Sequence, residues 1–166
     1  MDSAIVIRKY KQEDKEALVQ IMNNNVPQYF AETEVADYAY YLENEVQEYF
    51  VAVLDDRIIA GAGVNYEREK QLAKISWDVV DTGYHHQGIG TLLLNHRLEV
   101  ISNKKNIKTI SVRTSQHAYA FYEKNGFKLL ERHIDYWAEG FDMYKMVLSK
   151  NKMDELSQID QSNAVV

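Results

Sequence analysis

Two glycines stand at the start of a helical pattern, directly after a predicted strand. The strand pattern ends at Val80, a short polar loop follows, and Gly88 and Gly90 open the helix. The first turn of a helix has N–H groups without intrahelical partners and a partial positive charge, so it suits an anion such as pyrophosphate. Glycine lets the backbone approach phosphate oxygens because it has no Cβ. The pattern indicates a phosphate-binding loop; the alternative is a helix that simply begins at glycines.

The loop does not match the two most familiar nucleotide-binding motifs. No Gly-Lys-Ser/Thr follows Gly90, as a P-loop requires. Gly83 does not precede Gly88 at the spacing of a dinucleotide-binding fingerprint. We therefore do not expect a phosphate-binding NTPase.

Tyr122 is the second candidate for chemistry. It lies in a predicted helix from Ser115 to Lys124, on a mostly apolar face with Ala118 and Phe121. A phenol has a pKa of about 10, so at neutral pH it can donate a proton to a leaving group. The alternative is that Tyr122 is a core residue, as buried tyrosines commonly are.

Composition narrows the range of functions. The chain has 166 residues and no cysteine, so thiol nucleophiles, cysteine zinc sites and disulfides are excluded. The histidines at 85, 86 and 96 lack carboxylates at ligand spacing, and we predict no metal. Nineteen basic and 25 acidic residues give a net charge of −6, which argues against nucleic acid and is compatible with a cationic small molecule.

The N-terminal sequence and the hydropathy pattern indicate where in the cell the protein is located. No apolar stretch reaches the roughly 20 residues of a membrane helix, and the N-terminus lacks the pattern of a signal peptide. The sequence thus predicts a cytoplasmic protein without membrane association.

Periodicity predicts one mixed α/β domain over residues 1–149. Strand patterns lie at 4–10, 48–54, 57–66, 73–80, 107–113, 127–134 and 142–148, and helical patterns at 14–25, within 28–48, from 89 to 100 and at 115–124. Asp55-Asp56 predicts a hairpin turn, and Asn125-Gly126 predicts a helix end. Residues 150–166 are polar and aperiodic, which predicts a frayed tail.

Two separated stretches resemble the Gcn5-related N-acetyltransferase (GNAT) family. Residues 80–93 read VDTGYHHQGIGTLL and resemble its acetyl-coenzyme A pyrophosphate loop, and residues 118–127 read AYAFYEKNGF and resemble its helix-and-strand signature. The predicted element order also matches the family from Ile5 to Leu148. The resemblance implies a mostly antiparallel sheet of six to seven strands, flanked by about four helices and splayed at the cofactor cleft.

The resemblance also implies site residues. Backbone amides of the loop would hold the pyrophosphate of acetyl-coenzyme A, and the strand edge at Val79 and Val80 would pair with its pantetheine arm. Tyr122 would protonate the departing thiolate, without a metal. The implied cofactor-binding residues are Val79, Val80, His85, His86, Gln87, Gly88, Ile89, Gly90, Thr91 and Ser115.

Three positions depart from the family pattern. His85 stands where Arg or Gln is usual, so we expect weaker cofactor binding at high pH. Ser115 stands where many members have Asn, which leaves its cofactor contact less secure. Lys74 and Ser111 occupy positions where some members carry a catalytic Glu. We predict Asp78 as the general base; His117 or an ordered water is the alternative.

The expected acceptor is a primary amine, either a small molecule or a peptide. Aromatic residues predicted to contact it are Tyr29, Tyr38 and Tyr136. Since a familiar base is missing, a non-catalytic module that binds or senses acyl-coenzyme A is the alternative function. Strand edges expected near the C-terminus would allow a homodimer.

Overall fold

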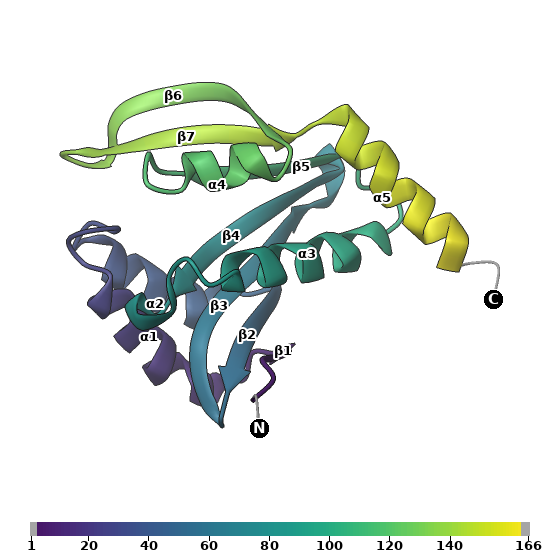
Figure 1. Cartoon of the computed structure of the whole chain (residues 1–166). Helices are drawn as coiled ribbons and strands as arrows, with labels where there is room; N and C mark the ends of the chain where they lie inside the picture. The colour runs from purple at the N-terminus through teal and green to yellow at the C-terminus, as the bar shows by residue number, and fades with distance from the viewer. Residues whose placement is uncertain (1–2, 164–166) are drawn as a thin grey trace. The chain divides into compact units, whose positions relative to one another are not determined.

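The computed structural model describes residues 3–163 and contains, in that range, seven strands and five α-helices (Figure 1). The strands are β1 (Val6–Lys9), β2 (Glu48–Leu54), β3 (Arg57–Glu67), β4 (Leu72–Val80), β5 (Thr109–Thr114), β6 (Phe127–Ala138) and β7 (Phe141–Leu148). The helices are α1 (Lys15–Asn24), α2 (Glu34–Asn44), α3 (Ile89–Ser102), α4 (Tyr119–Lys124) and α5 (Lys150–Asn163).

The strands are hydrogen bonded in the order β1-β2-β3-β4-β5-β7-β6. β4 and β5 run parallel, whereas β1–β2, β2–β3, β5–β7 and β6–β7 are antiparallel pairs. The predicted mixed α/β fold with a mostly antiparallel sheet is confirmed.

The chain divides into two compact units. The first comprises the chain up to Asn65 together with Ser76–Asn95, and the second comprises Tyr66–Ile75 and the chain from His96 onward. β4 contributes to both, because its first four residues pair with β5 in the second unit and its remaining residues belong to the first.

The core of the first unit lies between α1, α2 and the strands. Leu18, Ile21 and Met22 recur on one face of α1 and are buried, as helical spacing predicts. Tyr38, Tyr41 and Leu42 of α2 and Tyr49 and Val51 of β2 complete the same cluster. Asp55 and Asp56 connect β2 to β3 with positive φ angles of 49° and 61°, which confirms the predicted hairpin.

Glycines on β3 leave room for the ring of Tyr49. A Cβ at Gly61 would lie 2.7 Å from Cδ2 of Leu18 and 2.7 Å from Cε1 of Tyr49. A Cβ at Gly63 would lie 2.6 Å from Cδ2 of Tyr49 and 2.9 Å from the carbonyl oxygen of Glu48. The buried position of Tyr49 therefore depends on the absence of side chains at both glycines.

The structure of the second unit differs from two local predictions. Residues 150–163 form α5, although their polar pattern predicted a frayed tail. Just before the helix, the Ser149 amide donates to the Gly126 carbonyl, and within the helix the aliphatic part of Lys152 lies against Gly126. α4 begins at Tyr119, later than predicted, because the chain from Ser115 first makes a turn in which the Ser115 carbonyl accepts from the Ala118 amide.

The glycine positions give a prediction about stability. Gly63→Ala should lower the free energy of unfolding by about 1–3 kcal/mol, because the added methyl group overpacks Tyr49. Gly83→Ala is the matched control, since its Cβ would meet only Oδ1 of Asp81, at 3.4 Å. Denaturant unfolding of both variants tests this, and equal losses would contradict the role given to the β3 glycines.

Candidate functional site

The loop after β4 is fixed at its start by Asp81. The Asp81 amide donates to the Ile59 carbonyl at 2.8 Å, and its buried carboxylate accepts from the Gly83 amide at 2.9 Å. The other carboxylate oxygen lies 3.0 Å from the guanidinium of Arg57. These bonds close a single turn over Thr82–Tyr84 and set the direction in which the loop leaves the strand.

His85 and Asn25 hold the last carbonyl of β4. Nε2 of His85 lies 2.9 Å from the Val80 carbonyl oxygen, and Nδ2 of Asn25 donates to the same oxygen at 3.0 Å. A carbonyl only accepts, so Nε2 of His85 carries a proton in this bond. The ring of His85 also contacts Tyr29, edge to face, with centroids 4.8 Å apart.

The next residues present backbone at the start of α3. His86 and Gly88 have positive φ angles of 61° and 81°. A Cβ at Gly88 would meet nothing within 4 Å, so glycine is favoured there by its φ angle alone. His86, Gln87 and Gly88 are exposed, whereas Ile89 is buried.

This arrangement fits a diphosphate. The Leu92 amide donates to the Gly88 carbonyl, so the amides of Ile89, Gly90 and Thr91 belong to the first turn, where a helix has no internal acceptor for them. They lie next to an exposed loop without side-chain bulk at Gly88 and Gly90. The loop predicted from the sequence therefore has the form expected of an anion cradle.

β4 is irregular just before this loop. Trp77 has a φ angle of 48°, which is strained for a residue with a large side chain. Its ring packs against Tyr38, with centroids 5.2 Å apart, and against Tyr41. Asp78 follows as a half-buried residue, Val79 belongs to the core cluster, and Val80 is half-buried.

Of the residues predicted to contact the acceptor, Tyr29 lies against His85 in the first unit. Tyr38 is fully buried, and its hydroxyl is 2.6 Å from that of Tyr49. Tyr136, in the second unit, is 49% exposed on β6.

The remaining predicted residues lie in the second unit. Tyr122 is buried on α4, with its ring edge to face with Phe121 and Phe127 at 5.0 and 5.3 Å. The Ser115 hydroxyl accepts from the His117 amide at 3.3 Å and so supports the turn before α4. His117 itself is exposed and packs near Phe141.

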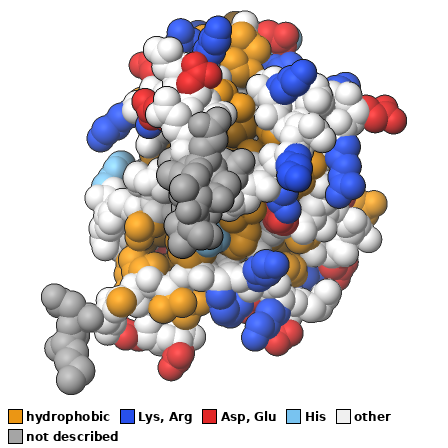
Figure 2. Space-filling view, turned by 90° about the vertical axis from the view of Figure 1, so that its right-hand side faces the viewer, with side chains coloured by type: hydrophobic (Ala, Val, Ile, Leu, Met, Phe, Trp, Pro, Cys, Tyr) orange, Lys and Arg blue, Asp and Glu red, His pale blue; other side chains and the backbone are white. Residues whose placement is uncertain are grey.

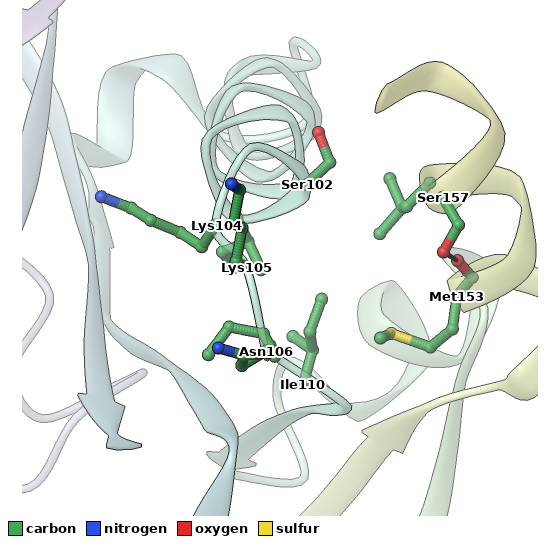
Figure 3. A pocket seen from close by; sticks show the side chains of 10 residues that line it. Ser102, Lys104, Lys105, Asn106, Ile110, Met153 and Ser157 are labelled. Carbon is green, nitrogen blue, oxygen red and sulfur yellow. Dashed lines mark hydrogen bonds between the residues drawn. The ribbon is translucent and has the colours of Figure 1, made fainter. Parts of the chain in front are cut away.

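The second unit also contains a pocket of about 400 Å³ between residues 101–110 and α5 (Figure 3). Met153 and Ser157 of α5 lie on one side, opposite Ser102 and Ile110. None of its lining residues belongs to the loop motif or to α4.

Charges on the surface are mixed. Figure 2 shows Lys and Arg side chains interspersed with Asp and Glu side chains, so the face it presents is not a continuous acidic surface. Among residues 3–163, no helix is long and apolar enough to cross a membrane, and no group of three or more His, Asp or Glu side chains could hold a metal ion.

Sequence reasoning missed Asn25 and Tyr49. Asn25 is buried at the end of α1, and Tyr49 donates from its hydroxyl to the Trp77 carbonyl at 2.7 Å. The bond from Asn25 to Val80 and the bond from Tyr49 to Trp77 each join residues far apart in the chain. A related signal in the sequence was the glycines of β3, of which Gly63 is the register partner of Tyr49.

A family model for the acetyltransferase (GNAT) domain matches residues 6–150. The chain belongs to the GNAT acetyltransferase family. A search of curated proteins found no significant match.

Solved structures of GNAT proteins share this fold. One is described as a GNAT-family acetyltransferase from Desulfovibrio desulfuricans, with a TM-score of 0.75, 16% identity and coverage of 88% of this chain and 99% of that one. The ribosomal-protein-S18-alanine N-acetyltransferase from Escherichia coli has a TM-score of 0.70 and 21% identity, with 87% and 93% covered. An aminoglycoside 6′-N-acetyltransferase complexed with coenzyme A has a TM-score of 0.69 and 16% identity, with 86% and 95% covered.

The anchoring of this GNAT loop gives a prediction about binding. His85→Ala should raise the Kd for coenzyme A by about three- to tenfold, because one donor to the Val80 carbonyl is lost. His85→Gln should restore most of the affinity, since an amide N–H can donate to the same oxygen.

Titration calorimetry measures both affinities. His133→Ala, at an exposed histidine of β6, is the control for a general effect of removing an imidazole. A His85→Ala variant that binds coenzyme A as tightly as this control would refute the anchoring role.

Proposed function

We propose that this protein is an acetyl-coenzyme A-dependent N-acetyltransferase that transfers the acetyl group to a primary amine. The observation that carries the proposal is the cradle formed by His86, Gly88 and the first turn of α3 directly after β4. The family match over residues 6–150 supports it. Because the chain has no cysteine, the proposed reaction is direct attack by the amine within a ternary complex.

The donor would be held by backbone groups. Amides from His86 to Thr91 would bind the diphosphate, with Gln87 at the exposed rim of the loop, and backbone groups of Val79 and Val80 would pair with the pantetheine arm. Ser115 is proposed as a further contact. Neutral amides suit this task because they donate hydrogen bonds at every pH at which the protein is folded.

Tyr122 is the proposed general acid. Its ring is held by two aromatic neighbours, which limits its motion and suits a group that must deliver a proton to one atom. At neutral pH an ordinary phenol retains its proton and can give it to a thiolate as that leaving group departs.

A protonated amine must lose a proton before it attacks the thioester. Asp78 is the proposed base, because it is half-buried next to the strand residues assigned to the pantetheine arm. An ordered water is the alternative route for this proton.

Exposed and half-exposed aromatic residues are proposed to contact the acceptor. Tyr136 and Tyr29 present ring surface that can bind a cationic amine. For Tyr38, which is fully buried, we propose a structural role through its bond to Tyr49.

The decisive experiment measures thiol release from acetyl-coenzyme A against a panel of small and peptide amines. An enzyme should release coenzyme A only when an acceptor is present, and mass spectrometry should find the acetylated amine. The alternative function, a non-catalytic module that binds acyl-coenzyme A, predicts thermal stabilisation by acetyl-coenzyme A without amine-dependent release.

Tyr122→Phe tests the proposed acid. We expect kcat to fall by about 10²- to 10⁴-fold, because the phenol proton is lost, while the Kd for acetyl-coenzyme A changes much less. Tyr119→Phe is the matched control on the same helix, since its hydroxyl donates to Glu123. Steady-state kinetics and calorimetry check both variants, and an unchanged kcat in Tyr122→Phe would remove this residue from the mechanism.

A further inference from the structure

A chain of buried hydroxyls ends at the strained residue of β4. The Tyr38 and Tyr49 hydroxyls are 2.6 Å apart, and the Tyr49 hydroxyl donates to the Trp77 carbonyl at 2.7 Å. Tyr49 has one hydroxyl proton, which this second bond uses, so Tyr38 must be the donor to Tyr49. The direction of the chain is therefore fixed, from α2 through β2 to the backbone of β4.

Both phenols stay protonated. Complete burial raises the pKa of Tyr38 and that of Tyr49 well above the ordinary tyrosine value, and the negative charge of Asp78 raises both further. The hydroxyl chain therefore keeps its direction across the working pH range of an enzyme.

The fold is shaped around this contact. The β3 glycines at 61 and 63 leave space for the Tyr49 ring, and without that space its hydroxyl could not reach β4. The preceding residue, Ser76, is also tied down, since its hydroxyl donates to Oδ1 of Asn65 at 3.0 Å. Ser76 is thus held by a side-chain hydrogen bond to the adjacent strand β3, and Trp77 by one from β2, the strand beyond it.

The held carbonyl belongs to the peptide that joins Trp77 to Asp78. A trans peptide is planar, and its C=O and N–H point in opposite directions. Fixing the Trp77 carbonyl therefore fixes the plane of the Asp78 amide and the direction in which the chain enters Asp78–Val80. Trp77 adopts a φ angle of 48°, and such strain persists only where the surroundings determine the conformation.

We propose that Tyr49 is a positioning residue for the acetyl-transfer site, and that its hydroxyl sets the orientation of the Trp77–Asp78 peptide and so of the strand segment Asp78–Val80. This inference rests on the proposed function, which assigns that segment to the thioester arm. The Tyr38 hydroxyl donates to the Tyr49 oxygen, whereas the bond to β4 comes from Tyr49. In this proposal Tyr49 acts through the backbone of β4 and does not contact the reacting atoms.

Three variants separate positioning from stability. Tyr49→Phe keeps the ring and removes the hydroxyl that holds Trp77. Tyr38→Phe removes the other hydroxyl of the same pair but leaves the bond from Tyr49 to Trp77 in place. Tyr10→Phe is the control, because its ring contacts Tyr49 edge to face while its hydroxyl is directed to the Leu42 carbonyl on α2.

The expected result is a difference between kcat and binding. Tyr49→Phe should lower kcat by about tenfold or more, because a misdirected strand misplaces the thioester, while the Kd for coenzyme A changes by less than about threefold. Tyr38→Phe should retain kcat within about threefold. It loses one buried hydrogen bond and Tyr49→Phe loses two, so both variants should unfold at lower temperature than wild type. The infrared band of acetyl-coenzyme A labelled with ¹³C at its thioester carbonyl should shift on binding to wild type and shift less on binding to Tyr49→Phe.

Other outcomes overturn the inference. If kcat in all three variants falls only in step with the melting temperature, or if Tyr38→Phe is as impaired as Tyr49→Phe, then Tyr49 has no role beyond stability. A wild-type protein that neither binds acetyl-coenzyme A nor releases thiol to any amine would instead refute the proposed function. Wild-type activity together with an unimpaired Tyr49→Phe would refute the Tyr49 inference alone.

Discussion

The end of β4 is held by side-chain donors that reach its backbone carbonyls from other elements. Tyr49 of β2 holds the carbonyl of Trp77, and Asn25 and His85 share that of Val80. A strand that departs from regular geometry at Trp77 loses part of the guidance that a hydrogen-bonded ladder provides. The side-chain hydrogen bonds provide this guidance instead. Because they fix the end of β4, they also set the place at which the following loop begins.

All three groups donate to carbonyls without needing a net charge. A buried charge would carry a large desolvation cost, whereas a phenol, an amide and a neutral imidazole can each satisfy a carbonyl at a lower one. Tyr49 shows the principle most clearly, since burial raises the pKa of its hydroxyl and so keeps the donor intact. The glycines on β3 leave the space that the uncharged Tyr49 side chain occupies.

Much of this architecture can be predicted from local sequence patterns. The features that cannot be predicted in this way depend on contacts between residues far apart in the chain. The α1 stripe of Leu18, Ile21 and Met22 and the turn at Asp55-Asp56 were predictable because helix periodicity and turn chemistry act over a few residues. The positive φ angle of Gly88 was also predictable, since a glycine in the loop after a strand indicates a turn with a positive φ angle. The bond from Tyr49 to Trp77 joins residues 28 positions apart, and no periodicity reports it. α5 was missed for a similar reason, because its contact with Gly126 is tertiary while its own pattern is polar.

The structure gives a physical explanation for one departure from the family pattern, the histidine at position 85. Nε2 of His85 donates to the Val80 carbonyl oxygen, and an imidazole can make this bond without a net charge. Weaker cofactor binding at high pH stays a prediction, and it requires the charge of the ring to act on the diphosphate. The structure shows that the His85 ring joins the loop to the end of β4 through a bond that Gln could also make. In the proposed function the backbone of the cradle would bind the diphosphate, and His85 would contribute by keeping that cradle at the end of the strand.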